Sequence, residues 1–218
     1  MTIILVDSKK LIMKPRTNLY SIALLPPQWL ANHIVDFKLN LARKFNFSES
    51  LKNFPLITLQ QPFLQLPYRE EILVDKLKSF AHKHHPIHVQ INGFGAFSDH
   101  TVYLKMKNPN GIRQLQKQLI YFLKEQLYFS EDMLTQHYLP HLKIATKDIK
   151  KDFKNIYADC KRKKFEADFN ASAMHLLKYN LNHWEVIASF QFLGVGFTMD
   201  LFSGNNSSIS ARSRMATT

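Results

Sequence analysis

The sequence has a single cysteine, Cys160, among its 218 residues. One cysteine excludes an intrachain disulfide and a metal centre built on several thiolates. Because Cys160 falls among the apolar positions of a predicted helix, we expect it to serve as a small buried hydrophobe. So little cysteine is typical of proteins from a reducing compartment, and we predict a cytoplasmic location.

Long apolar runs are also missing. Residues 3–6 form an apolar run that is too short to cross a bilayer, and Asp7 follows at once. The longer apolar region and the small-residue cleavage site of a signal peptide are not evident. We therefore expect a soluble protein with no membrane partner.

Acidic residues are scarce beside basic ones. The sequence has 17 Asp and Glu against 29 Lys and Arg, which gives a net charge of +12. Such a charge favours an anionic partner such as RNA, a nucleotide or acidic lipid. A basic surface that only keeps the protein in solution is the alternative. No P-loop, nucleophile elbow or dinucleotide-binding glycine motif is present to narrow the choice.

The hydrophobic residues are numerous and periodic. A hydrophobic share of 45% is ample for a core, and the length suggests one compact domain or two small lobes folded together. Apolar residues at helical spacing predict helices at 27–45, 70–83, 109–126 and 148–163. Alternating apolar residues predict strands at 19–25, 57–61, 87–91, 102–106, 141–146, 171–179 and 183–193.

The order of these elements repeats coarsely, because each half of the chain supplies one motif-bearing strand and one hairpin. We predict an α+β fold in which two antiparallel sheets face a central cleft, with helices on the outer faces. This bilobal domain would span residues 18–198, after a lead-in at 1–17 and before a mobile polar tail at 199–218. The cleft is the default binding site.

Two short segments match one motif, and each has lost part of it. Residues 55–59 are Pro-Leu-Ile-Thr-Leu, and residues 140–144 are Pro-His-Leu-Lys-Ile. In each, the residue after Pro and the residue two further on share one face of a strand. An intact copy would be His-x-Thr. The first segment keeps Thr58 but has Leu56 for the His, and the second keeps His141 but has Lys143 for the Thr.

Two intact His-x-Thr strands facing each other would make a phosphodiesterase centre. One imidazole takes a proton from the attacking water or hydroxyl, and the other gives a proton to the leaving oxygen, because the pKa of His lies near neutrality. The Thr hydroxyls hold non-bridging phosphate oxygens. This chemistry needs neither a metal nor a cofactor, and we expect none.

The motifs and their surroundings carry a family resemblance. The segments concerned are 20–27 (YSIALLPP), 55–63 (PLITLQQPF), 91–97 (INGFGAF), 140–148 (PHLKIATKD), 184–186 (WEV) and 192–194 (FLG). Over most of residues 18–195 the chain resembles the two-histidine (2H) phosphoesterases, the 2′-5′ RNA ligase or cyclic phosphodiesterase-like family. The resemblance implies a bilobal fold with a central cleft. It also implies activity on RNA ends or nucleotides that carry 2′-5′ bonds or 2′,3′-cyclic phosphates.

The chain departs from that family at both motifs. By the resemblance, Thr58 and His141 are the catalytic residues that persist, and Thr58 with Lys143 would bind phosphate. Leu56 marks the degenerate position, because its side chain neither takes nor gives a proton. Losing one positioned acid or base lowers a rate by roughly 10²–10⁴-fold. Lys143 would bind phosphate as a point charge and would lower the pKa of a nearby His141.

Three functions therefore stay open. The first is a catalytically impaired protein that binds RNA or a phosphate-bearing nucleotide in a basic cleft. The second is an active phosphodiesterase that uses His141 as its only acid or base, with Lys143 stabilising the developing charge. The third is a structural or interaction protein whose cleft is abandoned and filled by packing around Leu56. The oligomeric state is not predicted.

Two further groups of residues invite a functional interpretation. His82, His84, His85 and His88 lie close together in the sequence but straddle a helix end and Pro86, and their spacing matches no metal site. We do not expect them to bind a metal. Residues 161–164 form a basic run at a predicted helix C-terminus, where positive charge suits the helix dipole, and we expect a solvated helix end.

Overall fold

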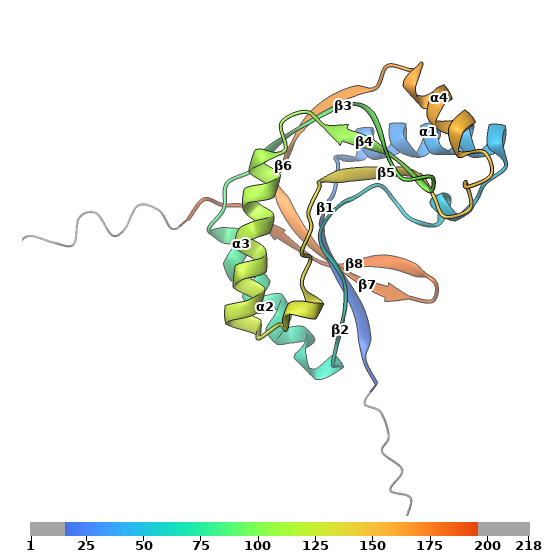
Figure 1. Cartoon of the computed structure of the whole chain (residues 1–218). Helices are drawn as coiled ribbons and strands as arrows, with labels where there is room; N and C mark the ends of the chain where they lie inside the picture. The colour runs from blue at the N-terminus through green and yellow to red at the C-terminus, as the bar shows by residue number, and fades with distance from the viewer. Residues whose placement is uncertain (1–15, 196–218) are drawn as a thin grey trace, which may run out of the picture.

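Two four-stranded antiparallel sheets form the centre of the molecule (Figure 1). The structure is a computed structural model and describes residues 16–195. The first sheet has the strand order β2-β1-β7-β8, and the second has the order β5-β4-β3-β6. The strands are β1 Asn18–Leu24, β2 Ile57–Gln65, β3 Ile87–Phe97, β4 Thr101–Met106, β5 His141–Thr146, β6 Glu166–Ala171, β7 Ala173–Asn180 and β8 His183–Gln191. The predicted tail lies outside the described residues.

Helices flank both sheets, which confirms the predicted α+β fold (Figure 1). In the second sheet, α1 (Gln28–Phe45) packs on β5, and α4 (Phe153–Lys161) packs on β3 and β4. Helix α2 (Glu70–His82) packs on β7 and β8 of the first sheet, and α3 (Asn110–Leu127) contacts α2, β2 and β3. Within residues 16–195, no helix is both long and apolar enough to cross a membrane.

Helix α1 forms where apolar residues recur at helical spacing. The carbonyl of Pro27 accepts the first backbone hydrogen bonds of the helix. Ile34 and Leu41 on its inner face are buried, and Asn46 ends the helix in the left-handed conformation at φ 51°. Lys38 lies on the same inner face, four residues after Ile34 and three before Leu41, and is also buried. This face of α1 therefore buries a positive charge in an apolar stripe.

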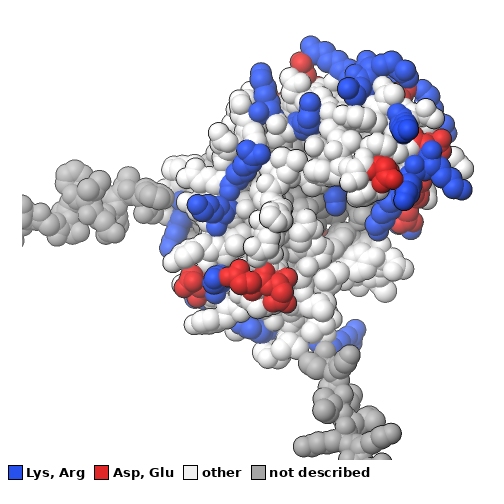
Figure 2. Space-filling view, in the orientation of Figure 1, with Lys and Arg blue, Asp and Glu red and all other residues white. Residues whose placement is uncertain are grey.

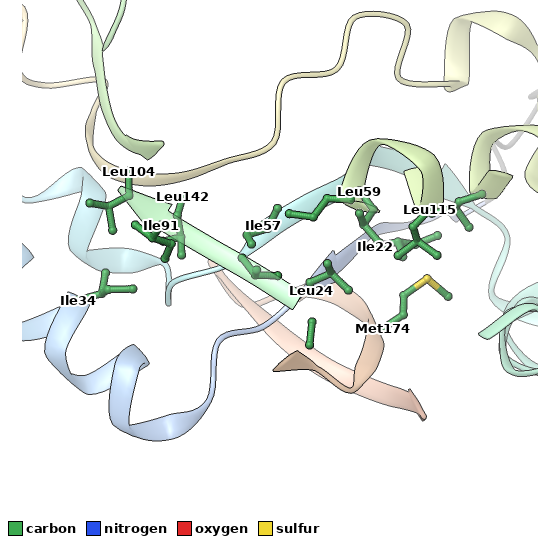
Figure 3. Close-up of a cluster of buried hydrophobic side chains, with 14 of the residues drawn as sticks. Ile22, Leu24, Ile34, Ile57, Leu59, Ile91, Leu104, Leu115, Leu142 and Met174 are labelled. Carbon is green, nitrogen blue, oxygen red and sulfur yellow. The ribbon is translucent and has the colours of Figure 1, made fainter. Parts of the chain in front are cut away.

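One hydrophobic core joins the two sheets. Figure 3 shows Ile91, Leu104 and Leu142 of the second sheet continuing into Ile57 and Leu24 of the first, and all five are buried. Complete burial of a side chain of this size stabilises the fold by about 1.5–3 kcal/mol. Because both sheets share this core, their relative position is fixed.

The two motif-bearing strands lie where the sheets meet. Strand β2 is an edge of the first sheet, and β5 is an edge of the second. These two edge strands contact each other, although about 80 residues separate them in the chain. The fold therefore brings the two altered motifs together.

The predicted helix at 148–163 was wrong at its start, since α4 begins at Phe153. The carboxylate of Asp148 instead accepts hydrogen bonds from the backbone N–H groups of Ser48 and Glu49, at 2.8 and 3.0 Å. These groups open the short 3₁₀ segment η1 (Glu49–Lys52). A tertiary contact thus takes precedence over the helical pattern of this segment.

Strand β6 was missed, and β8 differs from its predicted pattern. Only Phe169 and Ala171 are buried in β6, so its alternation is too short to predict a strand. The partner β3 supplies the pairing, with Val89 opposite Phe169. In β8 a register irregularity opposite Leu176 and Leu177 leaves Val186 exposed, although alternation predicts it on the buried face with Phe190.

Candidate functional site

A pocket of about 130 Å³ lies where the two motif strands meet. Both sheets contribute to its walls, and α1 and the segment before β2 complete them. All four motif residues, namely Leu56, Thr58, His141 and Lys143, line this pocket. The other lining residues are Ser21, Lys38, Ser50, Asn53, Phe54, Gln61, Pro62, Thr146, Leu177 and Trp184. We call it the motif pocket.

Strand alternation directs the motif residues into the pocket. In the first segment Ile57 and Leu59 are buried in the core, while Leu56 and Thr58 on the opposite face are half-buried. In the second segment Leu142 and Ile144 lie in the core, while His141 is half-buried and Lys143 is exposed on the opposite face. The prediction that the residue after Pro and the residue two further on share one face of the strand is confirmed in both segments. The catalytic and phosphate-binding roles stay predictions.

His141 is held in one orientation and one tautomer. Its Nδ1 atom lies 2.8 Å from the carbonyl oxygen of Leu139. A carbonyl only accepts, so Nδ1 carries the proton and Nε2 carries the lone pair of the neutral ring. The rings of Phe97 and Tyr103 contact the imidazole edge-to-face, with centroids 4.9 and 5.3 Å away. These contacts fix the ring on the pocket wall.

Burial lowers the pKa of His141. The hydrogen bond to Leu139 opposes that shift, and the charge of Lys143 adds to it. The effect of Lys143 has the direction that the sequence predicted. A neutral His141 at physiological pH can accept a hydrogen bond or a proton at Nε2 but cannot donate one there. The ring is therefore suited to act as a base or to bind a hydroxyl.

Lys143 places a positive charge in the same wall. Partial desolvation lowers its pKa, and the neighbouring charge of Lys147 adds to that shift. Among the described residues, Lys143 forms no ion pair with a carboxylate. No Asp or Glu within residues 16–195 lines the motif pocket. The pocket therefore favours an anion.

The four hydroxyls of the motif pocket differ in their availability. Ser21 donates to the carbonyl of Gln60 at 2.8 Å, and Ser50 accepts from the backbone N–H of Thr146 at 2.7 Å. The hydroxyl of Thr146 bonds to that of Thr101 at 2.9 Å. Thr58 has no side-chain hydrogen-bond partner among residues 16–195. Its hydroxyl is the one most free to bind a ligand oxygen.

Lys38 was not predicted as a site residue, although its position in the sequence is unusual. It stands on the apolar stripe of α1, where a charged residue is unusual. In the structure Lys38 lines the motif pocket and is only 4% exposed. Its Nζ donates to the carbonyl oxygen of Asn53 at 2.8 Å. Burial lowers its pKa to about 8.

The histidines between 82 and 88 lie outside the motif pocket. Both ring nitrogens of His84 are engaged, with Nδ1 at 2.8 Å from the carbonyl of Phe80 and Nε2 at 3.2 Å from the side chain of Gln118. In the part of the chain that the structure describes, no cluster of three or more His, Cys, Asp or Glu residues is arranged to hold a metal ion.

The basic run at 161–164 forms ion pairs at a helix end. Arg162 and Lys163 contact the buried carboxylate of Asp159, at 3.4 and 2.9 Å. Lys44 at the end of α1 joins the same carboxylate at 2.6 Å. Figure 2 shows that basic side chains gather over this end of the molecule, where α1 and α4 lie. Cys160, from the same helix, is fully buried as predicted.

Comparison with known proteins agrees with the fold. The model of the 2′-5′ RNA ligase superfamily matches residues 26–183. The chain therefore belongs to this superfamily, which confirms the resemblance to the 2H phosphoesterases. No curated protein sequence matches the chain.

Solved structures show the same architecture. Protein TT0787 of Thermus thermophilus aligns with a TM-score of 0.61 and 14% identity, over 82% of this chain and 100% of that one. LigT of E. coli in complex with 3′-AMP aligns with a TM-score of 0.58 and 13% identity, over 81% and 99%. LigT in complex with NADP⁺ gives 0.55 and 12%, over 82% and 99%. At these identities the likeness concerns the fold.

Proposed function

We propose that this protein binds the phosphate group of an RNA end or nucleotide in the motif pocket and is impaired in two-histidine catalysis. The observation that carries the proposal is the composition of the pocket. Leu56 stands at the position of the first histidine, while Lys143 and His141 stand in the opposite wall. Binding groups are thus present, and one catalytic group is missing.

The charge of the pocket supports phosphate binding. Two lysines line it without a carboxylate among the described residues, and the Thr58 hydroxyl is free of partners there. Superfamily membership supports a nucleotide or RNA end as the bearer of the phosphate, and LigT has been crystallised with 3′-AMP, ATP and NADP⁺. The net charge of +12 would add non-specific attraction to RNA.

The aliphatic side chain of Leu56 supports impaired catalysis. Two-histidine hydrolysis needs one ring to accept a proton while another donates one. His141 is held neutral with its free lone pair on Nε2, so it can serve as the base. The aliphatic Leu56 cannot serve as the acid. We expect a rate roughly 10²–10⁴-fold below that of a complete pair.

A binding titration tests the proposal. We expect 3′-AMP to bind the wild-type protein, and Lys143→Met to weaken that binding by about tenfold or more, since a charge-assisted hydrogen bond is lost. Lys117→Met on the exposed face of α3 is the matched control and should bind as the wild type does. Hydrolysis of 2′,3′-cyclic AMP should be slow, roughly 10²–10⁴-fold below the rate of a complete histidine pair. Ordinary turnover that His141→Ala abolishes would contradict the proposal.

A working phosphodiesterase with a rearranged centre is the second candidate. The neutral His141 and the nearby Lys143 favour it, because they could act as base and electrostatic stabiliser. It predicts a rate that depends on both residues and rises with pH through the pKa of His141. The abandoned-cleft alternative required packing that fills the space around Leu56, and the motif pocket beside that residue counts against it.

A further inference from the structure

Lys38 is a buried cation whose charge no carboxylate offsets. Its side chain is almost fully shielded from solvent, and Nζ has a single protein acceptor, the carbonyl oxygen of Asn53. None of the ion pairs within residues 16–195 includes it. Burying an ammonium without an ionic partner is costly, and an ammonium has three donors to satisfy. An anion that enters from the pocket would supply both the charge and the acceptors.

The position of Lys38 complements that of Lys143. Asn53, which binds the Lys38 ammonium, lies three residues before Leu56 in the segment that leads into β2. Lys38 therefore contacts the segment that leads to Leu56, and it lines the motif pocket. Lys143 belongs to β5 and lines the same pocket beside His141. The pocket thus has two lysines that come from different elements.

We propose that Lys38 and Lys143 together bind a terminal phosphomonoester, so that the pocket selects a nucleotide or RNA end with a free phosphate over a phosphodiester. This proposal rests on the proposed function and names the ligand class of the same site. A monoester carries close to two negative charges above its second pKa of about 6, whereas a diester carries one. Two ammonium groups match the dianion in charge.

The hydrogen-bonding groups of the pocket agree with this ligand class. A terminal phosphate presents three oxygens that only accept. The two lysines and the Thr58 hydroxyl can each donate to one. The neutral His141 offers an acceptor at Nε2, which suits the hydroxyl of an adjacent ribose better than a phosphate oxygen. One ribose that bears both a phosphate and a free hydroxyl would bind the two lysines and Thr58 through the phosphate and His141 through the hydroxyl.

The test compares a monoester with a diester in matched variants. Isothermal titration with 3′-AMP and with 2′,3′-cyclic AMP is carried out on wild type, Lys38→Met and Lys117→Met. We expect the wild type to bind 3′-AMP about tenfold or more tightly than the cyclic compound. Lys38→Met should lose most of that preference, with a loss of about tenfold for 3′-AMP and much less for the cyclic compound. Lys117→Met should keep it.

The outcomes separate this inference from the proposed function. If the wild type binds 3′-AMP and Lys38→Met binds it equally well, the role of Lys38 is wrong while the proposed function stands. Equal losses for both compounds would overturn the selection of a monoester. If the wild type binds neither compound, the proposed function fails and the inference fails with it.

A measurement on the unmodified protein covers the case in which Lys38→Met does not fold. Lysine side-chain NMR follows the ammonium of Lys38, identified by its contact with Asn53, as 3′-AMP is added. The other titratable groups that line the pocket are Lys143 and His141. We expect the Lys38 signal to shift in proportion to occupancy and the Lys117 signal to stay unchanged. A Lys38 signal that does not respond at saturation would overturn the inference.

Discussion

At the scale of single residues, three side chains give the site its proposed chemistry. Leu56 replaces an acid or base with an aliphatic group, and Lys143 replaces a hydroxyl with a cation. Lys38 places a second cation in an apolar stripe. Leu56 cannot transfer a proton, and the two lysines add positive charge. Under the proposed function, these residues favour anion binding over proton transfer.

The buried charge of Lys38 should lower the free energy of unfolding, and this prediction does not depend on any ligand. Burial lowers its pKa from 10.5 to about 8, and 1.36 kcal/mol corresponds to each pKa unit. We expect Lys38→Met to raise the free energy of unfolding at pH 7 by about 1–3 kcal/mol, as measured by urea denaturation. A less stable variant would show that the ammonium is required for folding.

The pH dependence of that difference has a definite sign. Between pH 8 and 10.5 the unfolded chain keeps a proton on Lys38 that the folded chain has released. The wild type should therefore gain stability, relative to Lys38→Met, as the pH rises through this window. The advantage of the variant should be constant below pH 8 and should shrink above it. A difference that is flat from pH 7 to 10 would contradict the burial of the charge.

His141 gives a second prediction at this scale. Its pKa lies below the usual 6.5 because the ring is desolvated, and Lys143 contributes to the shift. NMR titration of the His141 ring should therefore show a low pKa that moves upward in Lys143→Met, while Lys117→Met leaves it unchanged. If the pKa of His141 is unchanged in Lys143→Met, the charge of Lys143 does not act on His141, and the two residues do not share one pocket wall.

At the scale of elements, the buried carboxylate of Asp159 ties α1 to α4. It accepts from Lys44 and Lys163, and these hydrogen bonds lower its pKa to about 2. We expect Asp159→Asn to destabilise the fold at pH 7 by about 1–3 kcal/mol, because two lysines lose their partner. The contribution is present above the usual Asp pKa of 3.8 and is lost as the pH falls toward 2. Thermal denaturation measures this loss of stability, and Asp36→Asn on the exposed face of α1 is the control variant.

The elements themselves were largely predictable from the sequence, for physical reasons. Helix α1 and strand β5 carry regular apolar patterns that local geometry converts into one buried face. Strand β6 was missed because its apolar alternation is too short to predict a strand, and its hydrogen-bonded pairing with β3 stabilises it instead. The helix at 148 was predicted too early because Asp148 binds the backbone of a distant segment. Long-range contacts of this kind leave no periodic trace in the sequence.

The candidate site was predictable only in part. Its motif residues were found because two strands repeat one pattern. Trp184 was noted for its place in the family resemblance rather than as a pocket residue. Lys38 was missed because α1 was considered for its apolar stripe alone. Which residues meet across the cleft depends on the packing of the two sheets, and the spacing of residues within one helix does not contain that information.

At the scale of the whole molecule, a pocket lined by two lysines lies in a strongly basic protein. Positive charge gathers at the end where α1 and α4 lie (Figure 2). We expect binding of a short RNA with a 3′-phosphate to weaken steeply as salt rises, because phosphate contacts release counterions. Fluorescence anisotropy at several salt concentrations measures this slope. Lys38→Met and Lys143→Met should each reduce it by about one unit, and an unchanged slope in both would place the RNA elsewhere.

The central claim is that the fold keeps the geometry of a two-histidine cleft while the chain lacks part of its chemistry. The most direct measurement is the hydrolysis of 2′,3′-cyclic AMP by the double variant Leu56→His with Lys143→Thr, beside the wild type and each single variant. We predict a gain of roughly 10²–10⁴-fold in the double variant alone. A wild type that already hydrolyses the compound as fast, or a folded double variant that binds it without any gain in rate, would contradict the claim.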